Sequence, residues 1–182
     1  MNTQLSVASN YLVSFNTVSL EPIWIEHKLC TRVIENHAEF IVKMKPINII
    51  KKSLIFYGTS YKHATFFSKE AIGNLHKIPI ILSHDFGHPL IMMPTLSPDS
   101  DSNIWIAFSA VEYYSQNSLG QCLVHFTNTR VIPVNVSYTT MCRQFVLCHF
   151  LMNHFQKTRQ HIQKPFSQPP VTYLQSRILP KR

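Results

Sequence analysis

Hydrophobic and polar positions alternate over short distances in the first part of the chain. Tyr11, Val13 and Phe15 alternate with polar residues, and β-rich runs follow at 23–25 and 40–42. Short runs of this kind are typical of strands with one buried face. Further strands are predicted later in the chain, at 78–83, 90–93, 104–108, 122–126 and 131–136.

The middle of the chain contains a helical pattern with signals at both ends. Pro46 suits the first position of a helix, and Gly58 suits the position just past its end. One face of the predicted helix is apolar and is formed by Ile47, Ile50, Leu54 and Tyr57. We assign this face to the core, together with Phe56. A shorter helix is predicted at 65–76, although Gly73 weakens it.

The clearest helix lies late in the chain, at 138–163. Ser137 is a plausible N-cap residue, and prolines follow the last turn. Its apolar stripe recurs at helical spacing and consists of Met141, Phe145, Cys148, Met152 and Phe155. Strands first and a long helix late, without alternating βαβ units, predict an α+β fold of mostly antiparallel short strands with a mid-chain helix and one long C-terminal helix.

Length and composition place the chain in one globular domain. With 182 residues, 45% of them hydrophobic, it can bury a proper core. We assign residues 1–163 to that domain and 164–182, which contain several prolines, to an extended tail. No apolar run is long enough to span a membrane, and the N-terminus does not resemble a signal peptide. The four cysteines form no CxxC pair and predict reduced thiols in a cytoplasmic protein.

The charge is unevenly distributed along the chain. The net charge is +8, yet residues 78–112 carry four acids and no Lys or Arg. Residues 43–77 carry seven lysines and one acid, and residues 113–182 carry eight Lys or Arg and no acid. Solubility alone does not require such a distribution. It indicates an anionic partner, most often nucleic acid or a membrane surface.

Motifs for catalysis or for metal binding are not found. The run 84–87 reads His-Asp-Phe-Gly, but the chain lacks the other kinase motifs, so we predict a turn there. His84 and His88 flank a glycine and precede a proline, so they do not have the helical geometry that a metal site with this spacing needs. No phosphate-binding glycine loop or nucleophile elbow can be assembled. We therefore expect neither an enzyme nor a bound cofactor or metal.

Basic residues interleave with aromatic ones around the predicted mid-chain helix. Lysines at 43–52 precede the run Phe56-Tyr57-Gly58-Thr59-Ser60-Tyr61-Lys62. Lysines in such a surface neutralise phosphates, and hydroxyls bond to the nucleic-acid backbone. The alternative is that the aromatic residues are core and the lysines are merely solvated.

At these residues the sequence resembles the ComK family, the competence transcription factors of low-GC Gram-positive bacteria. The likeness runs from about Met44 to Ile106. Its residues are Met44-Lys45-Pro46, Ser53, the run 56–61, His76-Lys77, Pro79-Ile80, the run 93–97 and Trp105-Ile106. No single piece is diagnostic, but their order and near-gapless spacing are specific.

The resemblance implies a cytoplasmic transcription activator that binds paired AT-rich boxes of double-stranded DNA, largely through the minor groove. It also implies an assembly of several copies, RNA polymerase as a partner, and removal by an adaptor-coupled Clp protease. After the position of Tyr61 the family commonly has a glycine and two basic residues, whereas this chain has Lys62-His63-Ala64. The aromatic-rich adaptor motif has no clean counterpart near Phe166 and Tyr173.

We therefore predict a DNA-binding activator of the competence type. Its candidate DNA-binding residues are Lys43, Lys45, Lys51, Lys52, Ser60, Tyr61, Lys62 and Lys77, with Arg143, Lys157 and Arg159 on the late helix as second choices. One alternative is a binder of RNA or single strands that stacks bases on the same surface. Another is a diverged regulatory paralogue that pairs with an active homologue through the stripe at 141–155.

Overall fold

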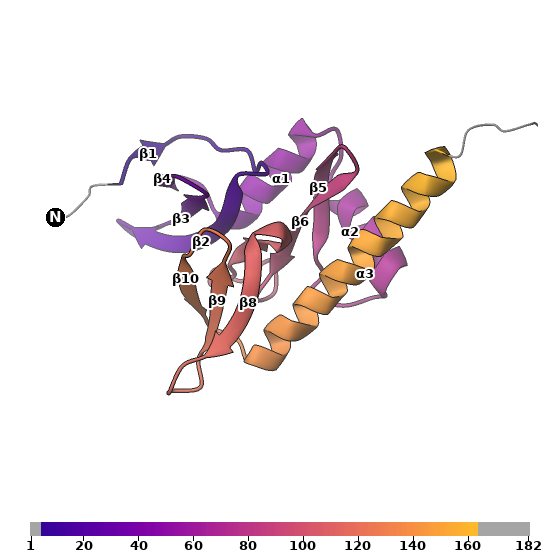
Figure 1. Ribbon diagram of the computed structural model, residues 1–182. Coiled ribbons are helices and arrows are strands. Elements are labelled where there is room, and N and C mark those ends of the chain that lie inside the picture. The colour runs from indigo at the N-terminus through magenta and orange to yellow at the C-terminus, as the bar shows by residue number, and fades with distance from the viewer. Residues whose placement is uncertain (1–4, 164–182) are drawn as a thin grey trace, which may run out of the picture.

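The computed structural model describes residues 5–163, which form a seven-stranded sheet, a three-stranded sheet and three α-helices (Figure 1). The strands are β1 Val7–Ala8, β2 Thr17–Ile25, β3 Lys28–Glu35, β4 Glu39–Val42, β5 Ile80–Asp85, β6 His88–Pro94, β7 Trp105–Ala107, β8 Val111–Gln116, β9 Cys122–Phe126 and β10 Val131–Val134. The helices are α1 Pro46–Phe56, α2 Tyr61–Ile72 and α3 Tyr138–Gln163, with a 3-10 turn at Phe108–Ala110.

The larger sheet has the order β1-β4-β3-β2-β7-β6-β5, and the smaller one the order β10-β9-β8. Among the described strands, β1 and β4 pair in parallel, and the other pairs are antiparallel. Two helices follow β4, and α3 follows the last strand. The predicted α+β fold is therefore confirmed, although no separate run was predicted for strands β1, β3 and β8.

The segment 11–15 is not a strand, so that prediction was wrong. At its centre, the backbone of Val13 is bonded by Ser53 of helix α1 and by Tyr57, which follows the helix. The Val13 N–H donates to Ser53 Oγ at 2.9 Å, and the Tyr57 hydroxyl donates to the Val13 carbonyl at 2.8 Å. The alternating pattern arises because the Val13 side chain is fully buried while Phe15 is exposed.

Helix α1 starts at Pro46 as predicted and ends just before Gly58, which adopts a φ of +81°. Ile49, Ile50 and Leu54 are completely buried. Phe56, by contrast, is 66% exposed, so its assignment to the core was wrong. The helix directs its buried face at 46–54 toward the sheet, and Phe56 lies in the last turn to one side of that face.

Helix α2 spans Tyr61–Ile72 and not the predicted 65–76, so each end lies four residues earlier than predicted. Ser60 caps its N-terminus, because Ser60 Oγ accepts a hydrogen bond from the His63 N–H at 3.3 Å. Gly73, with a φ of +88°, ends the helix. The buried face is made of small side chains, Ala64 and Ser68, which gives a weak hydrophobic signal and explains the misplaced start.

The turn predicted at 84–87 is narrower in the structure, because His84 and Asp85 end β5 and only residues 86–87 form the turn. It joins β5 to β6 in an antiparallel hairpin, and Phe86 and Gly87 both have positive φ angles, of 44° and 86°. A pair of such residues is what a tight two-residue hairpin requires. Phe86 lies at the tip of the hairpin and is 91% exposed.

Helix α3 covers the sheets from one side in Figure 1 and lies next to α2. Ser137 caps it as predicted, since its Oγ accepts from the Thr140 N–H at 3.2 Å. Met141 and Cys148 are completely buried, while Phe145 and Met152 pack against the core. The stripe at 141–155 therefore belongs largely to the protein's own core and is not a free pairing surface.

Three further predictions concern the chain as a whole. No helix within residues 5–163 is both long and apolar enough to cross a membrane. The four cysteines are free; Cys142 is half-buried and the other three are buried. The predicted tail at 164–182, with the region of the adaptor motif, lies outside the described residues.

Candidate nucleic-acid interface

Five of the predicted residues come together where α1 meets the start of α2. We call this surface the α1–α2 corner and define it by Lys51, Lys52, Ser60, Tyr61 and Lys62. The three lysines are exposed, and Lys51 Nζ lies 5.7 Å from the centre of the Tyr61 ring, within cation–π range. In the described part of the chain, no carboxylate forms an ion pair with any of the three lysines.

The chemistry of the corner favours a negatively charged partner. Burial, with a smaller effect of the nearby Asp99 charge, raises the pKa of Tyr61 above its ordinary value. Its hydroxyl therefore stays protonated at neutral pH and can donate a hydrogen bond. The first N–H groups of α2 lie at the same place and bring the positive end of the helix dipole to the surface.

Lys45 differs from the corner lysines because it already has a partner. Its Nζ lies 2.9 Å from Asp101 Oδ1 in the loop that follows β6. About half of each side chain is exposed, so the pair is a surface ion pair of modest strength. Lys43 is exposed beside it, and both line a cavity of about 480 Å³ that also includes Lys28.

Lys77 and Arg143 are brought together by the tertiary structure. Both line a cavity of about 290 Å³ between the α2–β5 connection and the start of α3. Gln144 is 4% exposed and ties the two segments together, since its Nε2 donates to the Lys77 carbonyl at 3.1 Å. Among the described residues that line this cavity none is acidic, so it carries a net positive charge.

The two remaining predicted cations lie in the last third of α3. Lys157 is exposed. The guanidinium of Arg159 covers Gly87 at the β5–β6 turn, where an added β-carbon would meet Nη1 at 1.5 Å. Arg143 and Arg159 are 16 positions apart, about 24 Å along a helix. The second-choice residues therefore do not form one cluster.

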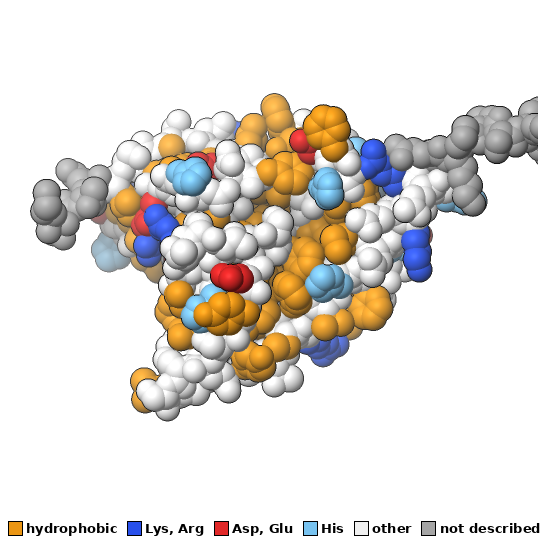
Figure 2. Space-filling model, in the orientation of Figure 1, with side chains coloured by type: hydrophobic (Ala, Val, Ile, Leu, Met, Phe, Trp, Pro, Cys, Tyr) orange, Lys and Arg blue, Asp and Glu red, His pale blue; other side chains and the backbone are white. Residues whose placement is uncertain are grey.

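One face of the molecule presents a different surface. In Figure 2, hydrophobic and His side chains gather beside α3, and the Lys and Arg side chains lie apart from one another. At α3 itself, Phe145 and His149 form an aromatic cluster with Phe108, in which the three ring centres lie 4.8 to 4.9 Å apart. This face is not the basic surface predicted from the sequence.

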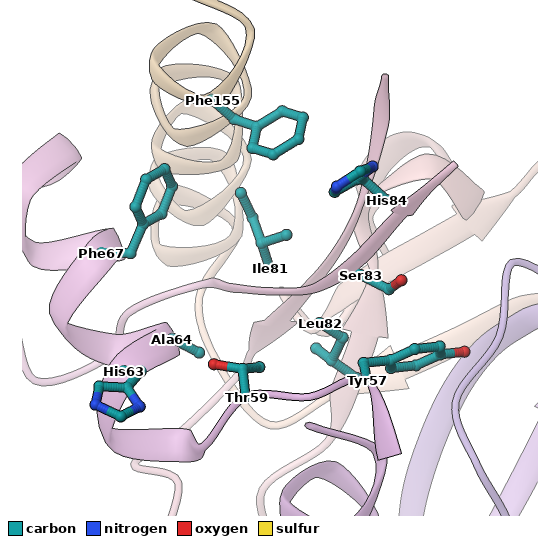
Figure 3. Close-up of a pocket in the computed structure, with 10 residues that line it drawn as sticks. All are labelled: Tyr57, Thr59, His63, Ala64, Phe67, Ile81, Leu82, Ser83, His84 and Phe155. Carbon is teal, nitrogen blue, oxygen red and sulfur yellow. The ribbon is translucent and has the colours of Figure 1, made fainter. Parts of the chain in front are cut away.

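A cavity of about 410 Å³ is lined by residues of the α1–α2 connection, α2, β5 and α3. Figure 3 shows Phe67 of α2 and Phe155 of α3 above it, with His84 and Ser83 of β5 on one side and His63 at the start of α2. The His84 ring lies 5.4 Å from that of Phe155. Aromatic, aliphatic, hydroxyl and His side chains line the cavity, and none of the described lining residues is Asp, Glu, Lys or Arg, so it adds no fixed charge to the interface.

Sequence reasoning missed two residues of α2. Phe66 is 62% exposed, and Lys69 is exposed in the last turn. Together with Lys62 they follow a spacing of four and then three residues, which places them on one helix face. A predicted helix that began just after Ser60, and not at residue 65, would have placed all three residues on one face.

The comparisons agree with the resemblance seen in the sequence. The chain is 28% identical to the competence transcription factor of Bacillus subtilis (strain 168) over 152 residues, which are 84% of this chain and 78% of that protein. No solved structure gives a significant match. The family model described as ComK protein matches residues 8–160. Because this match runs from β1 through nearly all of α3, the chain belongs to the ComK family.

Proposed function

We propose that this protein is a transcription activator that binds paired AT-rich boxes of duplex DNA through the minor groove. The family match and the Bacillus subtilis relative support the coarser part of this proposal, a competence transcription factor and not an enzyme. The preference for AT-rich boxes and the use of the minor groove are the finer part.

The observation that carries the proposal is the α1–α2 corner. Lys51, Lys52 and Lys62 are exposed there without carboxylate partners within residues 5–163. Phosphate contacts by such lysines release condensed counterions and supply much of the affinity of DNA-binding proteins. Ser60 and Tyr61 add hydroxyl groups that can bond to the DNA backbone.

A-tracts offer a natural target for this surface. Their minor groove is narrow and has an enhanced negative potential, which attracts inserted cations. The cavity of Lys77 and Arg143 supplies a second cationic site, at the other end of α2. The twelve residues of α2 span about 18 Å, or roughly five base pairs at ~3.4 Å each.

Paired boxes call for more than one copy of the chain. A symmetric assembly would match two boxes by placing its two-fold axis between them. From there the bound assembly would assist RNA polymerase. An adaptor-coupled Clp protease would remove the protein, as the family resemblance implies.

The decisive experiment measures fluorescence anisotropy of a duplex with two AT-rich boxes. A control duplex of equal length has GC-rich sequence in place of the boxes, and both are titrated at low and near-physiological salt. We expect a preference of at least ~10³ for the boxes that persists at the higher salt. Equal binding to both duplexes, lost as salt rises, would contradict sequence-specific recognition.

The double variant Lys51→Ala/Lys52→Ala tests the corner itself. We expect it to bind the boxes more weakly and to lower the slope of log K against log salt by about 0.9 for each lost phosphate contact. Lys28→Ala is the matched control, since Lys28 is exposed on β3 outside the corner. An unchanged slope in the double variant would place the DNA elsewhere. Better displacement by poly(dT) than by the AT-rich duplex would favour a single-strand binder.

A further inference from the structure

Helix α2 presents two faces of opposite character. One face is made of Ala64, Phe67 and Ser68, which are buried or packed against the core. The other face is exposed, and Phe66 projects from it with 62% of its surface accessible. Of the two neighbouring phenylalanines, Phe67 completes the core and Phe66 has no role in it.

The neighbours of Phe66 on the exposed face are mostly cationic or polar. Lys62 and His63 lie one turn before it, and Lys69 and Glu70 lie one turn after it. Residues three and four positions apart share a helix face, so a lysine lies on each side of the ring along the helix axis. Lys62 also belongs to the α1–α2 corner, which makes this face continuous with the proposed DNA surface.

We propose that Phe66 is a wedge that inserts between two base pairs from the minor groove when the protein binds an AT-rich box. This inference rests on the proposed function. Minor-groove proteins frequently insert an apolar side chain between base steps, partly unstack them and kink the duplex toward the major groove. Lys62 and Lys69 would then contact phosphates on either side of the inserted ring.

AT-rich sequence suits such a wedge. TA steps are flexible and easily unstacked, so insertion costs least where a box contains them. The wedge would thereby contribute to sequence preference without a hydrogen bond to any base. Kinking also widens the minor groove, which is otherwise about 6 Å wide, so that a helix can lie against it.

Charge argues for DNA as the occupant of this face. A protein partner would bury Phe66 among apolar side chains, whereas Lys62 and Lys69 flank it here and the corner adds Lys51 and Lys52. Charged residues, and lysine among them, are depleted in the cores of protein interfaces. Phe86 is more exposed still, at 91%, but its neighbours at the hairpin tip include Asp85.

The test uses the full chain and the two-box duplex with 2-aminopurine in place of one adenine at a TA step. Unstacking of this base raises its fluorescence. We expect the wild-type protein to raise the signal and Phe66→Ala to abolish the rise. The affinity of Phe66→Ala for the two-box duplex should fall by roughly ten- to hundredfold, as expected when an aromatic side chain that stacks on a base is lost. Phe66→Leu keeps an apolar wedge and should retain part of the rise.

Phe86→Ala is the matched control, an exposed phenylalanine at the β5–β6 hairpin tip and outside both the α1–α2 corner and α2, and should behave as the wild type. Circular dichroism checks that every variant folds. If Phe66→Ala keeps the fluorescence rise and the affinity, the wedge is excluded. A change in sedimentation of Phe66→Ala without DNA, with the rise retained, would exclude it too and assign Phe66 to a protein contact.

The wedge and the proposed function fail in distinguishable ways. A wild-type protein that binds AT-rich and GC-rich duplexes equally contradicts the proposed function and, with it, the wedge. A wild-type protein that prefers the boxes while Phe66→Ala binds them equally well contradicts the wedge alone.

Discussion

Two charged regions of this protein use their charges in opposite ways. Between β3, β4 and the β9–β10 turn, Glu39 accepts a hydrogen bond from Arg32 Nε at 2.6 Å and pairs with Arg130 as well. At the α1–α2 corner, Lys51 and Lys52 have no carboxylate partner among the described residues. The first region uses charge to hold two sheets together, and the second leaves charge available to a partner molecule.

The difference teaches which charges in a basic protein point to function. Arg32 and Arg130 contribute to the net charge as much as any lysine, but each forms an ion pair with Glu39. Only unbalanced cations raise the local potential enough to attract an anion. The net charge of +8 is therefore less informative than its distribution after the internal pairs are removed.

The largest effect is expected from Glu39→Gln. The substitution leaves Arg32 and Arg130 without their shared carboxylate and loosens the contact between the sheets. We expect the free energy of unfolding in urea to fall by about 2 kcal/mol, with no change in the salt dependence of DNA binding. Glu112→Gln is the control, because Glu112 is exposed on β8. Loss of DNA binding in a folded Glu39→Gln protein would contradict the separation of the two regions.

A smaller effect on the free energy of unfolding is expected when the pH is lowered. The hydrogen bond from Arg32, with that from Arg130, lowers the pKa of Glu39, so the folded state binds this proton less readily than the unfolded state. The stabilisation is complete above the unfolded pKa and is lost as the pH falls through the lower folded pKa. The difference in unfolding free energy between wild type and Glu39→Gln should therefore shrink below about pH 5.

Protonation of Glu21 affects the free energy of unfolding in the opposite direction from protonation of Glu39. The comparison of wild type with Glu39→Gln takes this into account. Burial raises the pKa of Glu21 despite the nearby Arg32, so its protonation favours the folded state as the pH falls. Because wild type and Glu39→Gln both contain Glu21, its contribution largely cancels in their difference. A difference that stays constant from pH 7 to pH 3 would show that Glu39 is not the group that titrates.

The smallest effect is expected from Asp101→Asn, which converts Lys45 from a paired cation into an unpaired one. DNA affinity at low salt should rise about two- to threefold, in keeping with the modest strength of a surface ion pair. Asp85→Asn removes an equal charge from the β5–β6 hairpin and serves as the control. Equal gains in both variants would mean that net charge alone matters and that Lys45 lies outside the interface.

Local signals in the sequence were sufficient for the parts of the fold that local chemistry controls. Pro46, Gly58 and Ser137 marked helix ends correctly, because a fixed φ, a positive φ and a side-chain cap act within a few residues. The strand predicted at 11–15 failed because the backbone partners of Val13, which are Ser53 and Tyr57, lie some forty residues away along the chain.

The candidate interface likewise combines features that follow from the sequence with features that depend on the tertiary structure. The sequence by itself determined that lysines and aromatic residues cluster at 43–62 and that the chain is α+β, because composition and periodicity are properties of neighbouring residues. Only the tertiary structure decided which cations are balanced and which are grouped. Lys45 meets Asp101 from 56 positions away, and Lys77 meets the start of α3 near Arg143 through Gln144, 67 positions away. Such pairings depend on how the sheets and helices pack, which no local pattern encodes.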